Sequence, residues 1–350
     1  GKTNVRLTQD PTSGGNIDNS IGVTQNFAMP GFYSNQKNVY RQQTSLRERA
    51  KTMTEAEIIK EVRIAYYNYL YGVQKLKVLD FLDSIYSDFS KKAAIRQTTG
   101  ETSNLEKLTA QNKYREILLK KNEAVADMRI YEVTMQQLIN SSQPLSIEGK
   151  LVPLSFREQA DTTALETGPV MDYYRQSVQV AGAKVRLEKA KMWPEVTLGY
   201  NHQLVIGGFD PAKINRGYFP GTRIAGFEVG LSLPLFAGAY KSRINAEKIG
   251  ESIAVAQLAT TRQQLNTAWN KVYQEYKKFR QTVEYYSTSG LALGEEQMRV
   301  AQFAFSKGEI GYIEYIQNIT MATDSKLNYL AAVNEYNAAV VNLEYLRGNK

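Results

Sequence analysis

The sequence has no cysteine and only one histidine, His202. The lack of cysteine excludes disulfides and thiolate metal sites, and it fits an oxidising compartment without proving one. His202 falls in a strand-like stretch, and we assign it no metal role. The chain also has no nucleophile elbow, no phosphate-binding glycine loop and no metal-spaced cluster of acids. We therefore expect neither an enzyme nor a cofactor.

Proline and long apolar runs are scarce as well. Nine prolines, widely scattered through 350 residues, leave room for very long helices. No run approaches the roughly 18 apolar residues of a transmembrane helix. The formal net charge is +8, but charges of both signs alternate along the helical stretches. This pattern favours solvated helix faces, and we expect no nucleic-acid partner.

The most informative feature that is present is an internal repeat. Gly100-Glu101 recurs as Gly308-Glu309 roughly 208 residues later, and Glu106 recurs as Glu314. Upstream, apolar positions match by pattern more than by identity: Ile58, Val62, Ala65, Tyr66 and Tyr69 correspond to Leu265, Trp269, Val272, Tyr273 and Tyr276. A shift that holds over about 80 residues indicates tandem duplication of one large unit.

The second copy, residues 166–350, is complete and defines the unit. Its pattern predicts a helix over 169–192, then strands over 195–205 and 223–235 that alternate apolar with polar residues. A helical hairpin over 240–347 follows, with its tip at Gly308. The apolar face of the strands carries Val196, Leu198, Tyr200, Phe227, Val229 and Leu231.

The hairpin of the second copy has a heptad seam. Its spacing alternates between four and three residues, which is typical of coiled-coil packing. The seam positions are Leu265, Trp269, Val272, Tyr276, Phe279, Val283 and Tyr286, then Tyr329, Val333, Tyr336, Val340 and Leu343 on the return helix. We expect one long helix from about residue 240 to 306, with a weak point at Ser289-Gly290.

The first copy, residues 1–140, repeats most of this unit. It has strands at about 2–8 and 19–28 and a helical hairpin over 35–140 with its tip at Gly100. A counterpart of the helix at 169–192 is missing, and we expect it to lie before residue 1, in a longer or trimmed polypeptide. Residues 141–165 are predicted as a linker between the repeats.

The strands point to a membrane. Four strands of about ten residues cannot close a barrel, for which eight is the usual minimum, but each is about long enough to cross a bilayer at a tilt. The apolar face suits lipid and the polar face suits a wet lumen, so we expect several copies to pool their strands. The alternative is a soluble coiled-coil scaffold or adaptor protein with the strands in a small sandwich; dependence on detergent would distinguish the two.

Two segments carry a family resemblance. The corner Gly230-Leu-Ser-Leu-Pro-Leu-Phe-Ala-Gly-Ala-Tyr240 and the tip Phe305-Ser-Lys-Gly308-Glu-Ile-Gly-Tyr-Ile-Glu314 resemble the signature segments of TolC-like outer-membrane efflux factors. The resemblance covers nearly the whole chain, including the duplication. It implies an α+β membrane protein that forms a homotrimer, with a twelve-stranded barrel in the outer membrane of a Gram-negative bacterium and a helical tunnel in the periplasm.

The same resemblance implies the function. The duct would be a passive, gated channel of a tripartite efflux system, opened by docking to a periplasmic adaptor (membrane fusion) protein and an inner-membrane transporter, most simply of the RND type. Type I protein secretion is the alternative within this family.

The resemblance also assigns site residues. Glu106, Glu314 and Gln317 match positions near the gate and constriction, where some relatives carry an acid in place of Gln317. Gly100, Leu105, Gly308 and Ile313 match the hairpin tips that face the adaptor. Ile310 stands where some relatives carry an arginine that ties the gate shut, so that link is not expected here.

Overall fold

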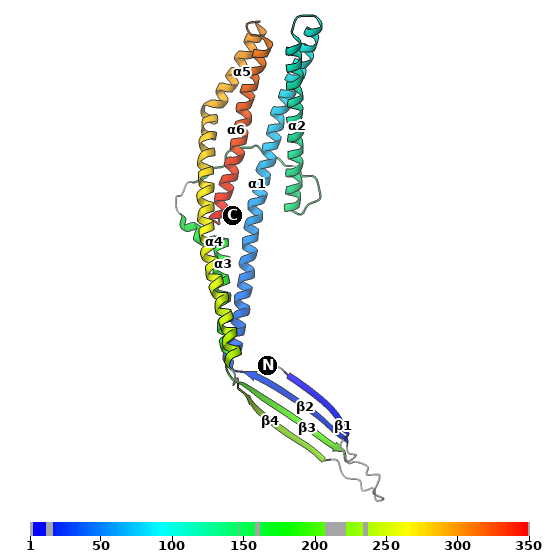
Figure 1. Ribbon diagram of the computed structural model, residues 1–350, viewed down its shortest axis with the longest axis vertical. Coiled ribbons are helices and arrows are strands. Elements are labelled where there is room, and N and C mark those ends of the chain that lie inside the picture. Colours follow the sequence, from blue (N-terminus) through cyan, green and yellow to red (C-terminus); the bar gives the residue numbers. More distant parts are fainter. Residues whose placement is uncertain are drawn as a thin grey trace. The chain divides into compact units, whose positions relative to one another are not determined.

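The computed structural model describes residues 3–11, 17–145, 147–157, 162–206, 222–233 and 237–348. It contains long helices and one four-stranded antiparallel sheet with the order β1-β2-β3-β4 (Figure 1). The predicted combination of long helices and four strands in each chain is therefore confirmed. The predicted end of the last strand, at residue 235, lies outside the described residues.

The strands and helices have the following bounds. The strands are β1 Thr3–Pro11, β2 Ile17–Ala28, β3 Glu195–Ile206 and β4 Thr222–Ser232. The long helices are α1 Pro30–Thr98, α2 Asn104–Leu138, α4 Ala237–Tyr285 and α6 Tyr312–Leu346. The shorter ones are the 3-10 helix η1 Thr162–Thr167, α3 Pro169–Ala190, the π-helical turn η2 Tyr286–Gly290 and α5 Leu291–Ser306.

The chain divides into two compact units. Unit 1 comprises Gly1–Ala50 and Tyr173–Thr260, and unit 2 comprises Lys51–Asp172 and Thr261–Lys350. Each unit takes part of both sequence repeats, so the spatial division runs across the duplication. Unit 1 contains the sheet, and unit 2 contains both helical hairpin tips.

The sheet of unit 1 has two different faces, because successive side chains along a strand point to opposite sides. The register places Val5, Val23, Tyr200 and Phe227 in one row across the four strands. The same face also carries Ile21, Phe27, Val196, Leu198, Val229 and Leu231. The opposite face carries Asn4, Arg6, Gly22, Thr24, Gly199, Asn201, Gly226 and Glu228. One face is thus apolar and the other is polar and rich in glycine.

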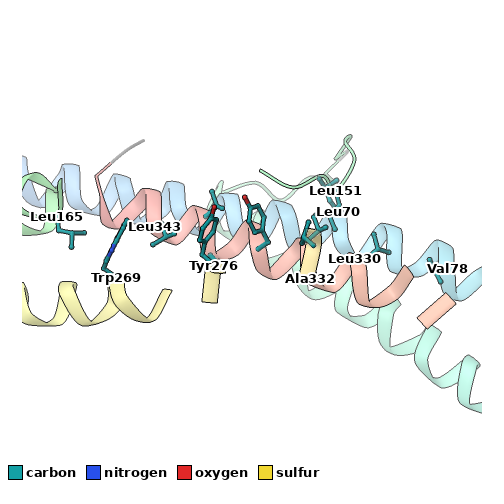
Figure 2. Packing of buried hydrophobic residues seen from close by; sticks show 14 residues of the cluster. Leu70, Val78, Leu151, Leu165, Trp269, Tyr276, Leu330, Ala332 and Leu343 are labelled. Carbon is teal, nitrogen blue, oxygen red and sulfur yellow. The ribbon is translucent and has the colours of Figure 1, made fainter. Parts of the chain in front are cut away.

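Unit 2 is held together by a core that follows the predicted heptads (Figure 2). Trp269 and Tyr276 of α4 are buried against α6, and the rings of Tyr276 and Tyr336 lie 5.4 Å apart between centroids. Val333, Val340 and Leu343 complete the α6 side of this cluster. On α1 the repeat position Ile58 is exposed although its match Leu265 is a seam position, and Leu70 and Val78 contribute to the core.

Part of the predicted linker is an ordered strap on unit 2, comprising residues 147–157. Asn337 of α6 is fully buried (0% exposed), donates from Nδ2 to the carbonyl of Val152 over 2.9 Å, and accepts at Oδ1 from the amide of Leu154 over 2.8 Å. The Tyr336 hydroxyl donates to the carbonyl of Leu154 over 3.0 Å. A buried side chain therefore binds the backbone of the strap much as a neighbouring strand would.

The long helix of the second hairpin contains a π-helical turn where the sequence predicts a weak point. The backbone stays helical through Tyr286–Gly290, so η2 joins α4 to α5 instead of ending the helix. A Cβ atom at Gly290 would lie 2.7 Å from Cδ1 of Tyr286. Because the ring of Tyr286, one turn earlier, leaves no space for a side chain, position 290 requires glycine. Heptad spacing alone does not predict this requirement.

Candidate functional site

The tips of the two hairpins share one backbone geometry. We call residues 96–107 the first tip and residues 304–315 the second tip. Gly100 and Gly308 adopt φ values of 77° and 75°, in the left-handed region that favours glycine. In the first tip the amide of Glu101 donates to the carbonyl of Arg96 over 2.8 Å, and in the second tip the amide of Glu309 donates to the carbonyl of Ala304 over 2.9 Å. Both helices therefore end in the same Schellman motif.

The side chains of the first tip form a polar network. Glu106 lies in the first turn of α2, where its carboxylate accepts from the Thr102 hydroxyl and lies 3.6 Å from Nη1 of Arg96. Ser103 caps α2 by accepting from the amide of Glu106 over 3.2 Å. Lys107 donates to the side-chain oxygen of Gln97 over 3.2 Å. The reversal between α1 and α2 is thus held by charge and hydrogen bonds.

The second tip is built from aromatic rings. Phe305 stacks on Tyr315 with ring centroids 4.7 Å apart, and Tyr312 stacks on Phe89 of α1 at 4.3 Å. Burial raises the pKa of the Tyr312 phenol, so this ring stays neutral. Gly311 is the N-cap residue of α6 and provides no side-chain cap. The second tip is therefore stabilised by aromatic packing, and the ring of Tyr312 packs against the first hairpin.

A cavity of about 570 Å³ lies between the two tips. Its lining comes from both hairpins: Phe89, Lys92, Ala93, Ile95 and Arg96 of α1, Glu106 of α2, and Phe305, Gly308, Ile310, Gly311, Tyr312 and Ile313 of the second tip. Its walls are largely apolar, and the Arg96–Glu106 pair is its polar corner. Both tips lie at the same end of unit 2 (Figure 1).

The acidic candidates have different surroundings. The side chain of Glu106 is only 17% exposed and reaches the cavity beside Arg96. Glu314, in the first turn of α6, is exposed and has no cationic partner among the described residues. Gln317 is exposed too, and neither Glu314 nor Gln317 lines the cavity. The structure therefore does not bring Glu106 and Glu314 together within one chain.

The apolar candidates at the tips are at the surface. Leu105 is 73% exposed, Ile313 is also exposed, and Ile313 lies on the rim of the cavity. Among the described residues, no atom other than those of the adjoining residues comes within 4 Å of a Cβ built on Gly100 or Gly308, so both reversals are exposed.

Sequence reasoning missed three residues of this region: Arg96, Phe89 and Tyr312. Arg96 is the basic residue in the last turn of α1, a position that favours cations. Its proximity to Glu106 follows from the tight reversal at Gly100, so a signal was available. The stacking of Tyr312 on Phe89 joins two hairpins far apart in sequence, and no local pattern indicates it.

The sheet residues predicted to face lipid lie on one exposed surface of unit 1. Leu198, Tyr200, Val229 and Leu231 are exposed, Val196 is half-buried, and Phe227 is 87% exposed. No helix in the described part of the chain is both long and apolar enough to cross a membrane. No group of three or more His, Asp or Glu residues suited to hold a metal ion occurs among the described residues.

Comparison with known proteins identifies the family. The family model "Outer membrane efflux protein" matches residues 162–349. The structure of CusC superimposes with a TM-score of 0.80 at 14% identity, over 100% of this chain and 83% of that one. The CmeC outer membrane channel of Campylobacter jejuni gives 0.81 at 12% identity, over 99% and 77%. The open state of the MtrE outer membrane channel of Neisseria gonorrhoeae gives 0.80 at 12%, over 99% and 80%.

No curated protein matches the sequence at a significant level. The structural likenesses, at these identities, establish the fold, and the family model establishes the relationship because it spans more than half of the chain. The predicted resemblance, the non-enzymatic role and the location in the outer membrane of a Gram-negative bacterium are thereby confirmed. With long helices, a sheet with one apolar face and this family match, the chain belongs to the outer membrane efflux protein family.

Proposed function

We propose that this chain forms the exit duct of a tripartite efflux system, working as a homotrimer. The observation that carries the proposal is the open sheet of unit 1. In the described part of the chain, β1 and β4 each pair with one strand, and the apolar face is exposed. Three copies joined edge to edge would give twelve strands, remove every free edge and turn the apolar faces, with Val196, Leu198, Tyr200, Phe227, Val229 and Leu231, toward lipid.

Unit 2 supports the same assembly independently. α5 presents Leu293, Val300 and Phe303 at intervals of seven and three residues, and all three are exposed. This heptad stripe is not covered by any described residue of its own chain, and a neighbouring copy would cover it by knobs-into-holes packing. The trimer would then be held through helices as well as through strands.

The tips are the proposed site of docking and gating. A periplasmic adaptor would contact Gly100, Leu105, Gly308 and Ile313, and an inner-membrane transporter, most simply of the RND type, would supply energy. The duct itself needs none: adaptor contact stabilises the splayed arrangement of the hairpins and shifts an existing equilibrium. The family match favours efflux over type I protein secretion, and it speaks against a soluble scaffold.

Glu106, Glu314 and Gln317 are the proposed constriction residues, and we expect them to contribute unequally to ion selectivity. Arg96 lies 3.6 Å from Glu106 and offsets its charge, whereas Glu314 has no cation nearby among the described residues. Three copies of Glu314 would therefore dominate the field of a narrow end and favour cations over anions.

The proposal is tested by single-channel conductance of the trimer in a planar bilayer under a salt gradient. Glu314→Gln should lower the preference for cations clearly, and Glu106→Gln should lower it less. Glu148→Gln, an exposed acid on the strap, serves as the matched control for loss of one charge. If selectivity is the same in Glu314→Gln and in the control, Glu314 is not at the constriction.

A further inference from the structure

A second cavity, of about 660 Å³, lies in unit 2 away from the tips. We call it the α1–α5–α6 groove, after the helices that supply most of its lining, and the strap closes one part of its rim. Its volume is within the range of about 300 to 1,000 Å³ that is usual for small-molecule sites. None of the residues assigned to docking or constriction lines it.

The interior of the groove is apolar. Val78, Ala322 and Leu330 are buried residues of its wall. Gly294 of α5 extends this wall, and a Cβ atom there would lie 3.4 Å from the carbonyl oxygen of Ala322. The hydroxyl of Thr323 donates to the carbonyl of Ile319 over 2.8 Å within α6, so it makes no demand on a ligand. The space therefore suits a hydrocarbon chain.

The rim of the groove is positively charged. Lys77 of α1, Lys150 of the strap and Lys326 of α6 line it, and among the described lining residues Glu295 of α5 is the one acid. Within the described residues none of the three ammonium groups has a carboxylate at ion-pair distance. Unpaired lysines around an apolar interior are complementary to an anion that carries an apolar body.

Lys150 reaches the rim because the strap is fixed there. The preceding residue, Gly149, has a φ of 150° that side chains rarely adopt, and a Cβ there would lie 2.6 Å from the Tyr66 hydroxyl oxygen. That hydroxyl donates to the carbonyl of Glu148 over 3.2 Å. The strap backbone is thus seated against α1 at the point where it presents the lysine, so the rim is a built feature of unit 2.

We propose that the α1–α5–α6 groove binds an amphipathic anion, a carboxylate or sulfate on an aliphatic chain. The chain would lie over Val78, Gly294 and Leu330, with the anionic head among the three lysines. Such a ligand would contact α1, α5 and α6 together, directly beyond the π-helical turn η2. It would bridge the second hairpin to the first one and stabilise their packing.

The experiment is calorimetric titration of decanoate, below its micelle concentration, into the full chain in nanodiscs of zwitterionic lipid. Empty nanodiscs correct for partitioning into lipid, and decanol is the uncharged ligand of equal length. Decanoate should bind more tightly than decanol. In the triple variant Lys77→Gln, Lys150→Gln, Lys326→Gln its affinity should fall roughly tenfold, as expected for three exposed charge contacts.

A matched triple variant, Lys91→Gln, Lys241→Gln, Lys248→Gln, removes the same charge at exposed lysines outside the groove and should bind as the unmodified protein does. Hydrogen exchange provides the second readout: decanoate should slow exchange at residues 291–298 and 322–330. The proposal is overturned if decanoate binds equally to both triple variants, if decanoate and decanol bind equally, or if no binding is seen beyond that to empty nanodiscs. It is also overturned if decanoate slows exchange only outside these two segments. None of these outcomes depends on the constriction, since Glu314 is not involved.

Discussion

Asn337→Ala should weaken the attachment of the strap to unit 2 without unfolding the helices. The Asn337 side chain makes two hydrogen bonds to the strap, to the carbonyl of Val152 and from the amide of Leu154. Each neutral hydrogen bond contributes about 1 kcal/mol net, so the strap should lose about 2 kcal/mol of local stability. This corresponds to an opening equilibrium about 30-fold larger.

Hydrogen exchange measured on the assembled trimer reports this equilibrium, because strap amides exchange through local opening. The amide of Leu154 should exchange about 30 times faster in Asn337→Ala. Asn337→Leu keeps the volume of the side chain but not its hydrogen bonds, and it should behave similarly. Its effect separates the hydrogen bonds from the cavity that alanine leaves.

The control is Asn342→Ala. Asn342 lies on the same helix, but its Nδ2 donates to the carbonyl of Ala338 within α6, over 2.9 Å. It makes no bond to the strap, so exchange at Leu154 should stay within about threefold of the unmodified protein. If Asn337→Ala leaves exchange of the strap unchanged, or if Asn342→Ala accelerates it equally, the strap is not held by Asn337.

Three further changes probe the sheet and the second tip. Val229→Arg places a charge on the apolar face and should cost about 2 to 4 kcal/mol of barrel stability near the bilayer midplane, whereas Glu228→Arg on the opposite face should be tolerated. The measurement is the amount of folded trimer in outer-membrane fractions. Equal yields of the two variants would contradict the assignment of faces. Gly308→Ala forces a Cβ into a left-handed conformation and should destabilise the second tip by about 1 kcal/mol, seen as faster exchange of its amides. Gly311→Ser supplies a side-chain cap like that of Ser103 in the first tip, so it should stabilise the second tip by about 0.5 to 1 kcal/mol and slow the exchange of its amides. Faster exchange would contradict the expectation that the missing cap destabilises the second tip.

Much of the fold could be predicted because it is encoded locally. The strand register follows alternation along each strand, and the α4 and α6 cores follow heptad spacing, so Trp269, Tyr276 and Val340 were found from sequence alone. The strap could not be predicted. Its hydrogen bonds join residues such as Leu154 and Asn337, which are far apart in the chain. A polar segment with prolines is typical of a linker, and its sequence does not show that the buried side-chain amide of Asn337 binds it.

The backbone reversals of the candidate site could be predicted from the sequence, but the side-chain contacts at the tips could not. A glycine directly after a helical pattern indicates a left-handed helix end such as the Schellman motif, and this signal is local. The role of Glu106 depends on Arg96, which lies across the reversal, and the role of Tyr312 depends on Phe89 in the other hairpin. A repeat in sequence therefore predicts equal geometry at the two tips, but not equal contacts.

That inequality has a consequence for gating. In the proposed gating, moving the first tip would break an ion pair and hydrogen bonds that water can replace, so it would cost little and depend on salt. Moving the second tip away from α1 separates Tyr312 from Phe89 and exposes apolar rings, which costs more and depends little on salt. In the proposed docking, a partner that opens the duct would supply apolar contacts at the second tip, and exposed Ile313, on the rim of the cavity that Tyr312 also lines, would receive them.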